Sequence, residues 1–320
     1  MLLSQDQIKY LKSHKDQITF DLLQALRKHG NEGKQLALDI LDTPMDAEMY
    51  HLDAFGNRIS MDGDRKLKKP YTKMNLAPIH IEEIQRCKED IHYFKDNYVK
   101  IKTQKGINFP DIRPYQNEFL DVLNGNYESI ISLMSRQAGK SITVAIELSW
   151  HYLFNENINI GICANKSKLA REFLNNVKNI FLELPMWMQP GTITWNKGSI
   201  VNENAMRILT DAPSSDSFRG FTIGLLVVDE LAFIKNDKWK AMKDSVIPSQ
   251  SGLSWKKNIF ISTANGLNHF FDLVNGAKKR KRLYNVSKDQ KVRMKDGSII
   301  TLDEYYKIVQ DRQQTVTEQA

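Results

Sequence analysis

One short segment combines the residue types and the spacing that phosphate binding requires. Residues 135–141 read Ser-Arg-Gln-Ala-Gly-Lys-Ser, with an apolar run before them and a helix-forming segment after them. In such a loop, backbone N–H groups hold the phosphates, the lysine contacts the β- and γ-phosphates, and the next hydroxyl coordinates Mg²⁺. We therefore predict that Lys140 binds a nucleoside triphosphate and that Ser141 binds its Mg²⁺. The segment departs from the usual loop at Met134, where a glycine is expected.

A second segment supplies two carboxylates. Residues 225–230 read Leu-Leu-Val-Val-Asp-Glu, so a buried strand is expected to end in Asp229 and Glu230. Ligands of open α/β sheets bind beyond the carboxyl ends of the strands, where these side chains would lie. We predict that Asp229 holds the Mg²⁺ shell and that Glu230 orients or deprotonates the water that attacks the γ-phosphate.

The elements that must position these residues follow from the apolar pattern. Apolar runs predict strands at 129–134, 158–163, 223–228 and 257–262, and shorter strand-like runs lie between 191 and 209. Helical patterns occupy the intervening segments, notably at 140–154 and 168–184. Apolar strands that alternate with helices predict an α/β fold with a mostly parallel sheet flanked by helices.

The flanking regions have a different texture. Residues 1–45 carry apolar side chains at helical spacing, and His29 to Gly33 is typical of a helix end. Residues 80–100 predict one amphipathic helix, and Asp296-Gly297 predicts a hairpin turn. The predicted division has three parts: a helical and turn-rich N-terminal region at 1–78, a nucleotide-binding domain at 79–276, and a basic linker with a hairpin and helix at 277–320.

Composition excludes several classes of protein. The 320 residues are 41% hydrophobic and 26% charged, which is typical of a globular chain with a sizeable core. No run approaches the roughly 18 to 20 apolar residues of a membrane span, and the N-terminus lacks a signal-peptide pattern, so we expect a cytosolic protein without a membrane partner. Cys87 and Cys163 are too few for a disulfide framework. The net charge of 45 − 38 = +7 permits a polyanionic partner.

Four segments together resemble one known family. They are Arg-Pro-Tyr-Gln at 113–116, the loop at 135–141, Leu-Leu-Val-Val-Asp-Glu-Leu-Ala-Phe-Ile at 225–234 and Ser-Thr-Ala-Asn-Gly-Leu-Asn-His-Phe-Phe-Asp at 262–272. The set is similar to the ATPase domain of tailed-bacteriophage large terminase subunits of the T-even type, which drive DNA into proheads. The resemblance implies a P-loop fold of the RecA-like (ASCE) type. A glycine-poor loop that carries Arg136 is a mark of this family and accounts for Met134.

The resemblance also assigns roles in nucleotide binding. Tyr115 and Gln116 fall on the adenine-binding motif, and Arg113 helps to position them. Arg136 is expected to sense the γ-phosphate from within its own subunit. The remaining ATP-binding residues are those of the loop: Ser135, Gln137, Ala138, Gly139, Lys140 and Ser141.

Two further roles concern assembly and coupling. Arg219 matches the arginine that relatives offer to the ATP of a neighbouring subunit, where it would stabilise charge during phosphoryl transfer. The motif at the end of the last strand is expected to couple hydrolysis to DNA movement. Its residues are Ser262, Thr263 and Asn265.

The resemblance implies an ATP hydrolase that uses ATP and Mg²⁺ to translocate double-stranded DNA into a prohead. The implied partners are DNA, the portal protein, the small terminase subunit and further copies of the chain in a ring, a pentamer by resemblance. The implied location is the cytoplasm of the infected bacterium, with transient residence at the portal and absence from the mature virion. Only some forty residues follow Gly276. We therefore expect no nuclease activity from this chain and a nuclease domain that is truncated away or a separate chain.

Two alternatives use the same motifs differently. A DEAD-like helicase or translocase would use the Asp-Glu pair and the glutamine motif, but it needs a second RecA-like lobe that this length does not hold. A nucleotide-dependent scaffold would bind ATP without useful turnover, and the carboxylate of Glu230 argues against it. The histidines form no His-Glu-x-x-His pattern and no Gly-x-Ser-x-Gly elbow is present, so zinc hydrolase and serine hydrolase chemistry are not indicated.

Overall fold

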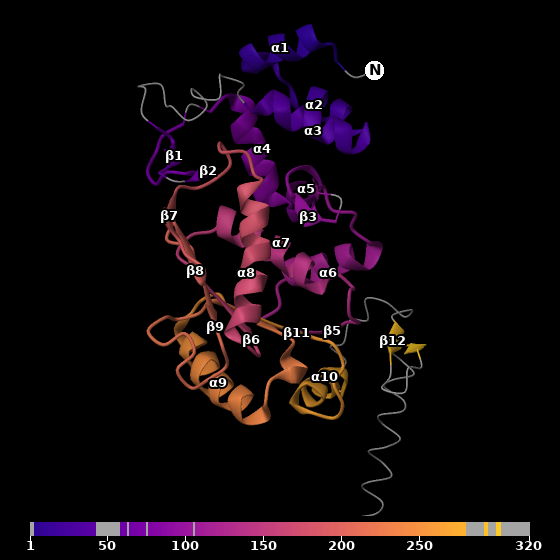
Figure 1. Cartoon of the computed structure of the whole chain (residues 1–320), viewed down its shortest axis with the longest axis vertical. Coiled ribbons are helices and arrows are strands. Elements are labelled where there is room, and N and C mark those ends of the chain that lie inside the picture. The colour runs from indigo at the N-terminus through magenta and orange to yellow at the C-terminus, as the bar shows by residue number, and fades with distance from the viewer. Residues whose placement is uncertain are drawn as a thin grey trace, which may run out of the picture. The chain divides into compact units, whose positions relative to one another are not determined.

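The computed structural model describes residues 3–42, 58–62, 64–74, 76–104, 106–279, 291–293 and 299–301 (Figure 1). The chain divides into two compact units. The first contains Met1–Asp111, Ala145–Ile158 and Leu174–Ile208, and the second contains Ile112–Val144, Asn159–Phe173 and Leu209–Ala320. The domain boundaries at 78 and 276 stay a prediction.

The largest sheet among the described residues has seven strands in the order β5-β11-β10-β6-β9-β8-β7. β5 pairs with β11, β11 with β10, and β10 with β6 in parallel, whereas β7 and β8 pair antiparallel. This arrangement confirms the predicted α/β fold with a mostly parallel sheet. The strands are β5 (Ser129–Leu133), β6 (Asn159–Ala164), β7 (Thr192–Trp195), β8 (Ser199–Asn202), β9 (Arg207–Asp211), β10 (Leu225–Asp229) and β11 (Lys257–Ser262).

The register of the parallel strands brings the chemical segments to one edge. Asp229 at the end of β10 lies opposite Ile261 of β11, and Ser262 at the end of β11 lies opposite Leu133 of β5. All three strands therefore end at the same level. The loop after β5, the carboxylates after β10 and the hydroxyls after β11 leave the sheet side by side.

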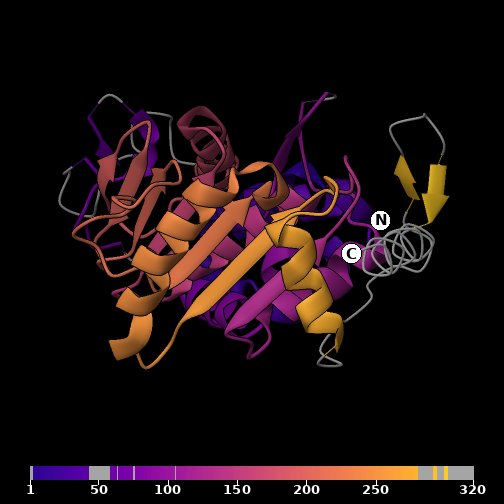
Figure 2. The same ribbon diagram turned by 90° about the horizontal axis from the view of Figure 1, so that it is seen from below.

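Two helices of the second unit cover one face of this sheet. Figure 2 shows α9 (Asn236–Ser249) and α10 (His269–Lys279) on the face turned to the viewer. Side chains alternate between faces along a strand, so Leu226 and Val228 of β10 point the same way. They form one buried cluster with Phe260 of β11, Trp239 of α9 and Phe270 of α10. Each such buried side chain contributes about 1.5–3 kcal/mol to folding.

Three further helices complete the strand–helix alternation. These helices are α6 (Pro114–Asn124), α7 (Lys140–Phe154) and α8 (Ser167–Leu182). α7 begins at Lys140, directly after the phosphate-type loop, as the pattern predicts.

The first unit contains the N-terminal helices and two small hairpins that the sequence pattern did not indicate. The helices are α1 (Gln5–Ser13), α2 (Phe20–Arg27), α3 (Gly30–Leu41), α4 (Pro78–Glu89) and α5 (Ile91–Asn97). The hairpins are β1 (Ser60–Met61) with β2 (Asp64–Lys68), and β3 (Ile101–Thr103) with β4 (Gly106–Asn108).

Two expectations for these helices were wrong in detail. α2 ends at Arg27 and Gly30 has a φ of 71°, in agreement with the predicted helix end, but α3 already begins at Gly30, so Gly33 lies inside α3. A Cβ at Gly33 would lie 1.9 Å from the carbonyl oxygen of Leu26, so this glycine permits close packing of α3 on α2. The single helix expected at 80–100 is broken at Asp90, whose carboxylate accepts a hydrogen bond from the backbone N–H of His92 (2.8 Å). This cap starts a new helix, α5, although the apolar face continues.

The hairpin predicted around Asp296-Gly297 is confirmed by its strands. β12 (Lys291–Arg293) pairs antiparallel with β13 (Ile299–Thr301), while the turn itself and the basic run at 278–282 beyond Lys279 lie outside the described residues. Within the described part of the chain, no helix has the length and apolar character needed to cross a membrane.

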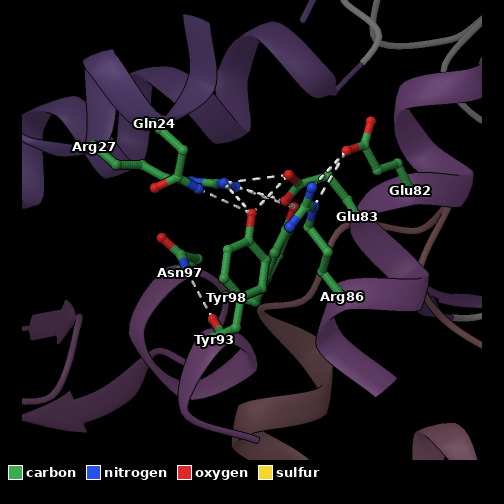
Figure 3. A network of polar contacts seen from close by, with 8 residues as sticks. All are labelled: Gln24, Arg27, Glu82, Glu83, Arg86, Tyr93, Asn97 and Tyr98. Carbon is green, nitrogen blue, oxygen red and sulfur yellow. Dashed lines mark hydrogen bonds and ion pairs between the residues drawn. The ribbon is translucent and has the colours of Figure 1, made fainter. Parts of the chain in front are cut away.

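A buried polar network holds α2 against α4 and α5 (Figure 3). The guanidinium of Arg27 forms an ion pair with the carboxylate of Glu83 (Nη2 to Oε2, 2.8 Å). The hydroxyls of Tyr93 and Tyr98 both donate to the same carboxylate. Burial, the largest single effect, opposes the charge of Arg27, but the hydrogen bond to Glu83 and the electrostatic attraction of Tyr98, Glu83 and Tyr93 together outweigh it and raise the pKa of the guanidinium. The guanidinium therefore remains charged.

Candidate nucleotide site

The loop between β5 and α7 has the backbone of an anion-binding turn. Gln137 (φ 59°) and Gly139 (φ 76°) both adopt left-handed conformations, which bend the chain sharply before the helix begins. Met134, at the position of the missing glycine, is buried, and its backbone N–H donates to the carbonyl oxygen of Ser262 (3.1 Å). The loop is thus anchored to the end of β11 by its first residue, and an apolar side chain fits where the usual loop has none.

The side chain of Gln116 supports the phosphate-type loop through Thr143 and Gly139. Gln116 of α6 is buried, and its side chain accepts from the backbone N–H of Arg113 (3.1 Å) and donates to the hydroxyl of Thr143 (3.3 Å). That hydroxyl in turn donates to the carbonyl oxygen of Gly139 (3.1 Å). Gly139 has a φ of 76°, where a side chain is strained, and a Cβ there would also lie 2.3 Å from Nε2 of Gln116. Thr143 was not indicated by the sequence pattern, because a threonine in a helix has many ordinary roles.

The lysine of the loop lies against the second carboxylate. Nζ of Lys140 is 2.6 Å from Oε1 of Glu230, and both side chains are largely shielded from water. The structure therefore brings together the two residues to which the sequence assigns phosphate binding and water activation. The contact joins residues ninety positions apart, as the shared edge of the sheet requires.

The other oxygen of Glu230 is held by the end of β11. Oε2 accepts hydrogen bonds from the hydroxyl of Ser262 (3.3 Å) and from the backbone N–H and hydroxyl of Thr263 (3.3 and 3.2 Å). Burial favours the neutral acid, but the hydrogen bond and the charge of Lys140, with the donors of Thr263, outweigh it and lower the pKa of Glu230 below 4.5. The carboxylate is therefore ionised at neutral pH.

Asp229 is in a different electrostatic position. Burial, followed by the neighbouring charge of Glu230, raises the pKa of Asp229 from 3.8 to about 6. Its Oδ1 accepts the backbone N–H of Glu230 (3.0 Å). A buried carboxylate whose charge is disfavoured is a suitable ligand for a cation, since a divalent ion would restore the charged form. Within the described residues, no three His, Cys, Asp or Glu side chains cluster as a metal site of their own.

The remaining predicted site residues are placed as follows. The hydroxyl of Tyr115 donates to the carbonyl oxygen of Ala138 in the loop (3.1 Å) and accepts from Arg113 (2.9 Å). Arg136 is exposed in the loop. Arg219 lies outside this cluster of contacts; its exposed side chain forms an ion pair with Asp216 (2.9 Å). Asn265 does not reach the carboxylates, because its Nδ2 donates to the carbonyl oxygen of Ala232 (2.9 Å).

The sheet, the glycine turn and the Lys140–Glu230 contact together define a P-loop protein of the α/β class. Comparison with known proteins narrows this class. Residues 131–319 match the family model described as "Terminase large subunit, T4likevirus-type, N-terminal". This match spans more than half of the chain. The chain therefore belongs to the T4-type terminase large subunit family, which confirms the predicted resemblance.

One solved structure supports this fold, and two further structures are similar over part of the chain. The large terminase of bacteriophage HK97 matches with a TM-score of 0.53 at 16% identity, over 66% of this chain and 45% of that chain. The ATPase domain of the Thermus phage P74-26 large terminase matches with a TM-score of 0.44 at 17% identity, over 52% of this chain and 70% of that domain. The large terminase of the thermophilic bacteriophage D6E in complex with ADP matches with a TM-score of 0.42 at 15% identity, over 53% of this chain and 44% of that chain. The chain thus spans about half the length of the HK97 and D6E proteins.

Proposed function

We propose that this chain binds Mg²⁺-ATP at the carboxyl edge of its sheet and hydrolyses it to move double-stranded DNA into a viral prohead. The observation that carries the proposal is the 2.6 Å contact between Lys140 and Glu230. A phosphate-loop lysine and an ionised carboxylate occupy the same point, which is where a γ-phosphate and an attacking water would meet. Membership of the terminase family supplies the DNA-packaging context.

The contacts of Glu230 indicate how the residues would act. When the γ-phosphate enters, Lys140 exchanges the carboxylate for phosphate oxygens, and Oε1 of Glu230 is left free to accept a proton from water. Oε2 stays bound to Ser262 and Thr263, so the carboxylate keeps its orientation during this exchange. One oxygen of the Glu230 carboxylate therefore stays hydrogen-bonded, while the other becomes free to act as a base.

The donor set fits Mg²⁺. Mg²⁺ in nucleotide sites takes one or two protein oxygens together with phosphate oxygens. The hydroxyl of Ser141 and the carboxylate of Asp229 would supply the protein ligands. Mg²⁺, when bound, withdraws charge from the phosphates as the bond breaks. We assign adenine recognition and support of the loop to three residues that contact the loop or one another: Arg113, Tyr115 and Gln116.

The test of turnover is ATP hydrolysis with Mg²⁺ by the wild-type chain and by Glu230→Gln. We expect a fall in kcat of about 10²- to 10⁴-fold, the usual contribution of a positioned base. Binding of a fluorescent ADP analogue should persist in the variant. Undiminished hydrolysis by Glu230→Gln would contradict the assigned role. Binding without hydrolysis by the wild type would favour the nucleotide-dependent scaffold.

The proposed partners are a ring of identical subunits, DNA, the portal protein and the small terminase subunit, in the cytoplasm of the infected bacterium. Arg219 is exposed and forms an ion pair with Asp216 at the surface, which suits donation to a neighbour's site. Hydrolysis per chain should then rise with protein concentration in the wild type and stay low in Arg219→Ala. A rate that is independent of concentration and unchanged in Arg219→Ala would mean a self-contained ATPase.

A further inference from the structure

The backbone of Glu230 is held in a conformation that it would not adopt freely. Its φ of 51° and ψ of 45° lie in the left-handed region, which costs a residue with a long side chain free energy unless its surroundings impose it. The short helical turn Leu231–Phe233 follows at once. The direction in which Glu230 leaves β10 therefore depends on whatever holds this turn.

Side chains from the segment after β11 hold the turn at its carbonyl oxygens. The oxygen of Ala232 accepts hydrogen bonds from Nδ2 of Asn265 and from Nδ2 of Asn268 (both 2.9 Å). The oxygen of Leu231 lies 3.1 Å from Nε2 of His269. The N–H of Ala232 donates to the hydroxyl of Ser262 (3.1 Å), so both backbone polar groups of this residue are held.

Asn268 and His269 are themselves fixed by α10 and α9. Oδ1 of Asn268 accepts the backbone N–H groups of Phe270 and Phe271 (3.0 and 3.2 Å), which caps the first turn of α10. The ring of His269 stacks on Trp239 of α9, with centroids 6.0 Å apart. Burial lowers the pKa of His269, so the ring is neutral at neutral pH, and its contact with a carbonyl oxygen requires the proton on Nε2.

We propose that Asn268 and His269 are positioning residues for Glu230, an inference that rests on the proposed ATPase function. Their donors fix the turn after Glu230 and thereby keep its carboxylate between Lys140 and Thr263. The cap of α10 and the catalytic turn share one amide group. A movement of α10 is consequently transmitted to Glu230 without any contact with nucleotide.

The amide of Asn268 allows the two tasks to be separated. Asn268→Asp retains the oxygen that caps α10 but has no N–H to give to the carbonyl oxygens of Ala232 and Asn265 (both 2.9 Å), whereas Asn268→Ala loses the cap as well. We expect Asn268→Asp to lower kcat for ATP by about tenfold or more, with KM and the affinity for a fluorescent ADP analogue changed less than about twofold. Its thermal midpoint should stay closer to that of the wild type than the midpoint of Asn268→Ala does.

His269 provides an independent pair. His269→Gln offers an N–H at a similar reach, whereas His269→Phe keeps the ring on Trp239 without a donor. We expect kcat to be largely kept in His269→Gln and to fall about as far in His269→Phe as in Asn268→Asp. Equal loss in Gln and Phe variants of the same stability would overturn the proposal, because the donor would then have no role.

Coupling to Glu230 decides whether these residues act through it. In a Glu230→Gln background, Asn268→Asp should reduce the residual single-turnover rate by less than about twofold, since residues that act as one unit are not additive. A full additive loss in that background would overturn the proposal. Absence of hydrolysis by the wild type would overturn the proposed function and this inference with it. Wild-type hydrolysis that persists in Asn268→Asp and His269→Phe would overturn this inference alone.

Discussion

Two regions of the molecule each contain a shielded cation–carboxylate pair, and the pairs are completed in different ways. Arg27 and Glu83 of the first unit have side chains exposed by 4% and 0%, and Lys140 and Glu230 of the second by 9% and 29%. Both oxygens of Glu83 accept from the guanidinium, and each accepts a tyrosine hydroxyl as well. Oε2 of Glu230 accepts hydrogen bonds from the hydroxyl of Ser262 and from the N–H and hydroxyl of Thr263, whereas Oε1 accepts one from Lys140.

The difference separates a pair that supports the fold from a pair that can react. Every acceptor of Glu83 is matched within the chain, and opening the pair would leave two charges inside the protein. Glu230 keeps 29% of its side chain exposed at the sheet edge, against 0% for Glu83. Its Oε1 accepts from one donor, Lys140, whereas each oxygen of Glu83 accepts from two, and in the proposed mechanism a phosphate takes the place of the carboxylate on that lysine. Exposure and the single donor on Oε1 therefore distinguish the two pairs.

The largest expected effect comes from breaking the closed pair. Arg27→Met should lower the free energy of unfolding by about 3–5 kcal/mol, because Glu83 is left buried without its cation. Denaturant unfolding of the wild type and the variant measures this fall in free energy. Arg86→Met is the matched control, since the Arg86–Glu82 pair lies on the same helix with 41% and 44% of its side chains exposed, and exposed pairs contribute about 0–1 kcal/mol. Equal losses of unfolding free energy in the two variants would contradict the greater contribution assigned to the buried Arg27–Glu83 pair.

A smaller effect is expected on the open pair. Thr263→Val keeps the shape of the side chain but removes the hydroxyl that donates to Oε2 of Glu230. A hydrogen bond to a charged group is worth about 1.5–3 kcal/mol, so kcat for ATP should fall by about tenfold or more. Steady-state hydrolysis measures the fall, and binding of a fluorescent ADP analogue should be unchanged. A raised KM with an unchanged kcat would show that Thr263 serves substrate binding instead.

The smallest effect belongs to a single hydroxyl of the closed network. Tyr93→Phe removes one donor to Oε1 of Glu83 (2.7 Å) and the oxygen that accepts from Arg27 and Gln24, and it leaves the ion pair in place. The free energy of unfolding should fall by about 1–2 kcal/mol, because one hydrogen bond typically contributes about 1 kcal/mol net. Thermal or denaturant unfolding measures this, with ATP hydrolysis as the control that should not change. A loss as large as that of Arg27→Met would mean that the tyrosine, not the guanidinium, satisfies Glu83.

The sequence predicted the residues of the proposed nucleotide site better than the residues that support them. Apolar runs that end in Asp229 and Ser262 required parallel strands, and parallel strands place their carboxyl ends together. The meeting of Lys140 with Glu230 follows from that topology. The supports do not, because Asn268 and Thr143 depend on where α10 and α6 pack. Likewise Arg27 and Glu83 are 56 positions apart and no local pattern joins them.

Local chemistry overrode the apolar pattern in the N-terminal half. The apolar face at 80–100 continues through Asp90, but the carboxylate there caps a new helix and divides the segment. Gly33 lies within α3, where the close carbonyl oxygen of Leu26 leaves no room for a side chain. Both features involve single contacts that periodicity does not register.

The most direct test of the nucleotide site is stabilisation by ligand. Unfolding would be measured with and without a non-hydrolysable ATP analogue and Mg²⁺, on the wild type, Lys140→Met and Arg27→Met. At a ligand concentration of about 100 times Kd, binding adds about 2.7 kcal/mol to the free energy of unfolding. We expect this gain in the wild type and in Arg27→Met, and none in Lys140→Met. An equal gain in Lys140→Met, or none in the wild type, would contradict the proposed nucleotide site.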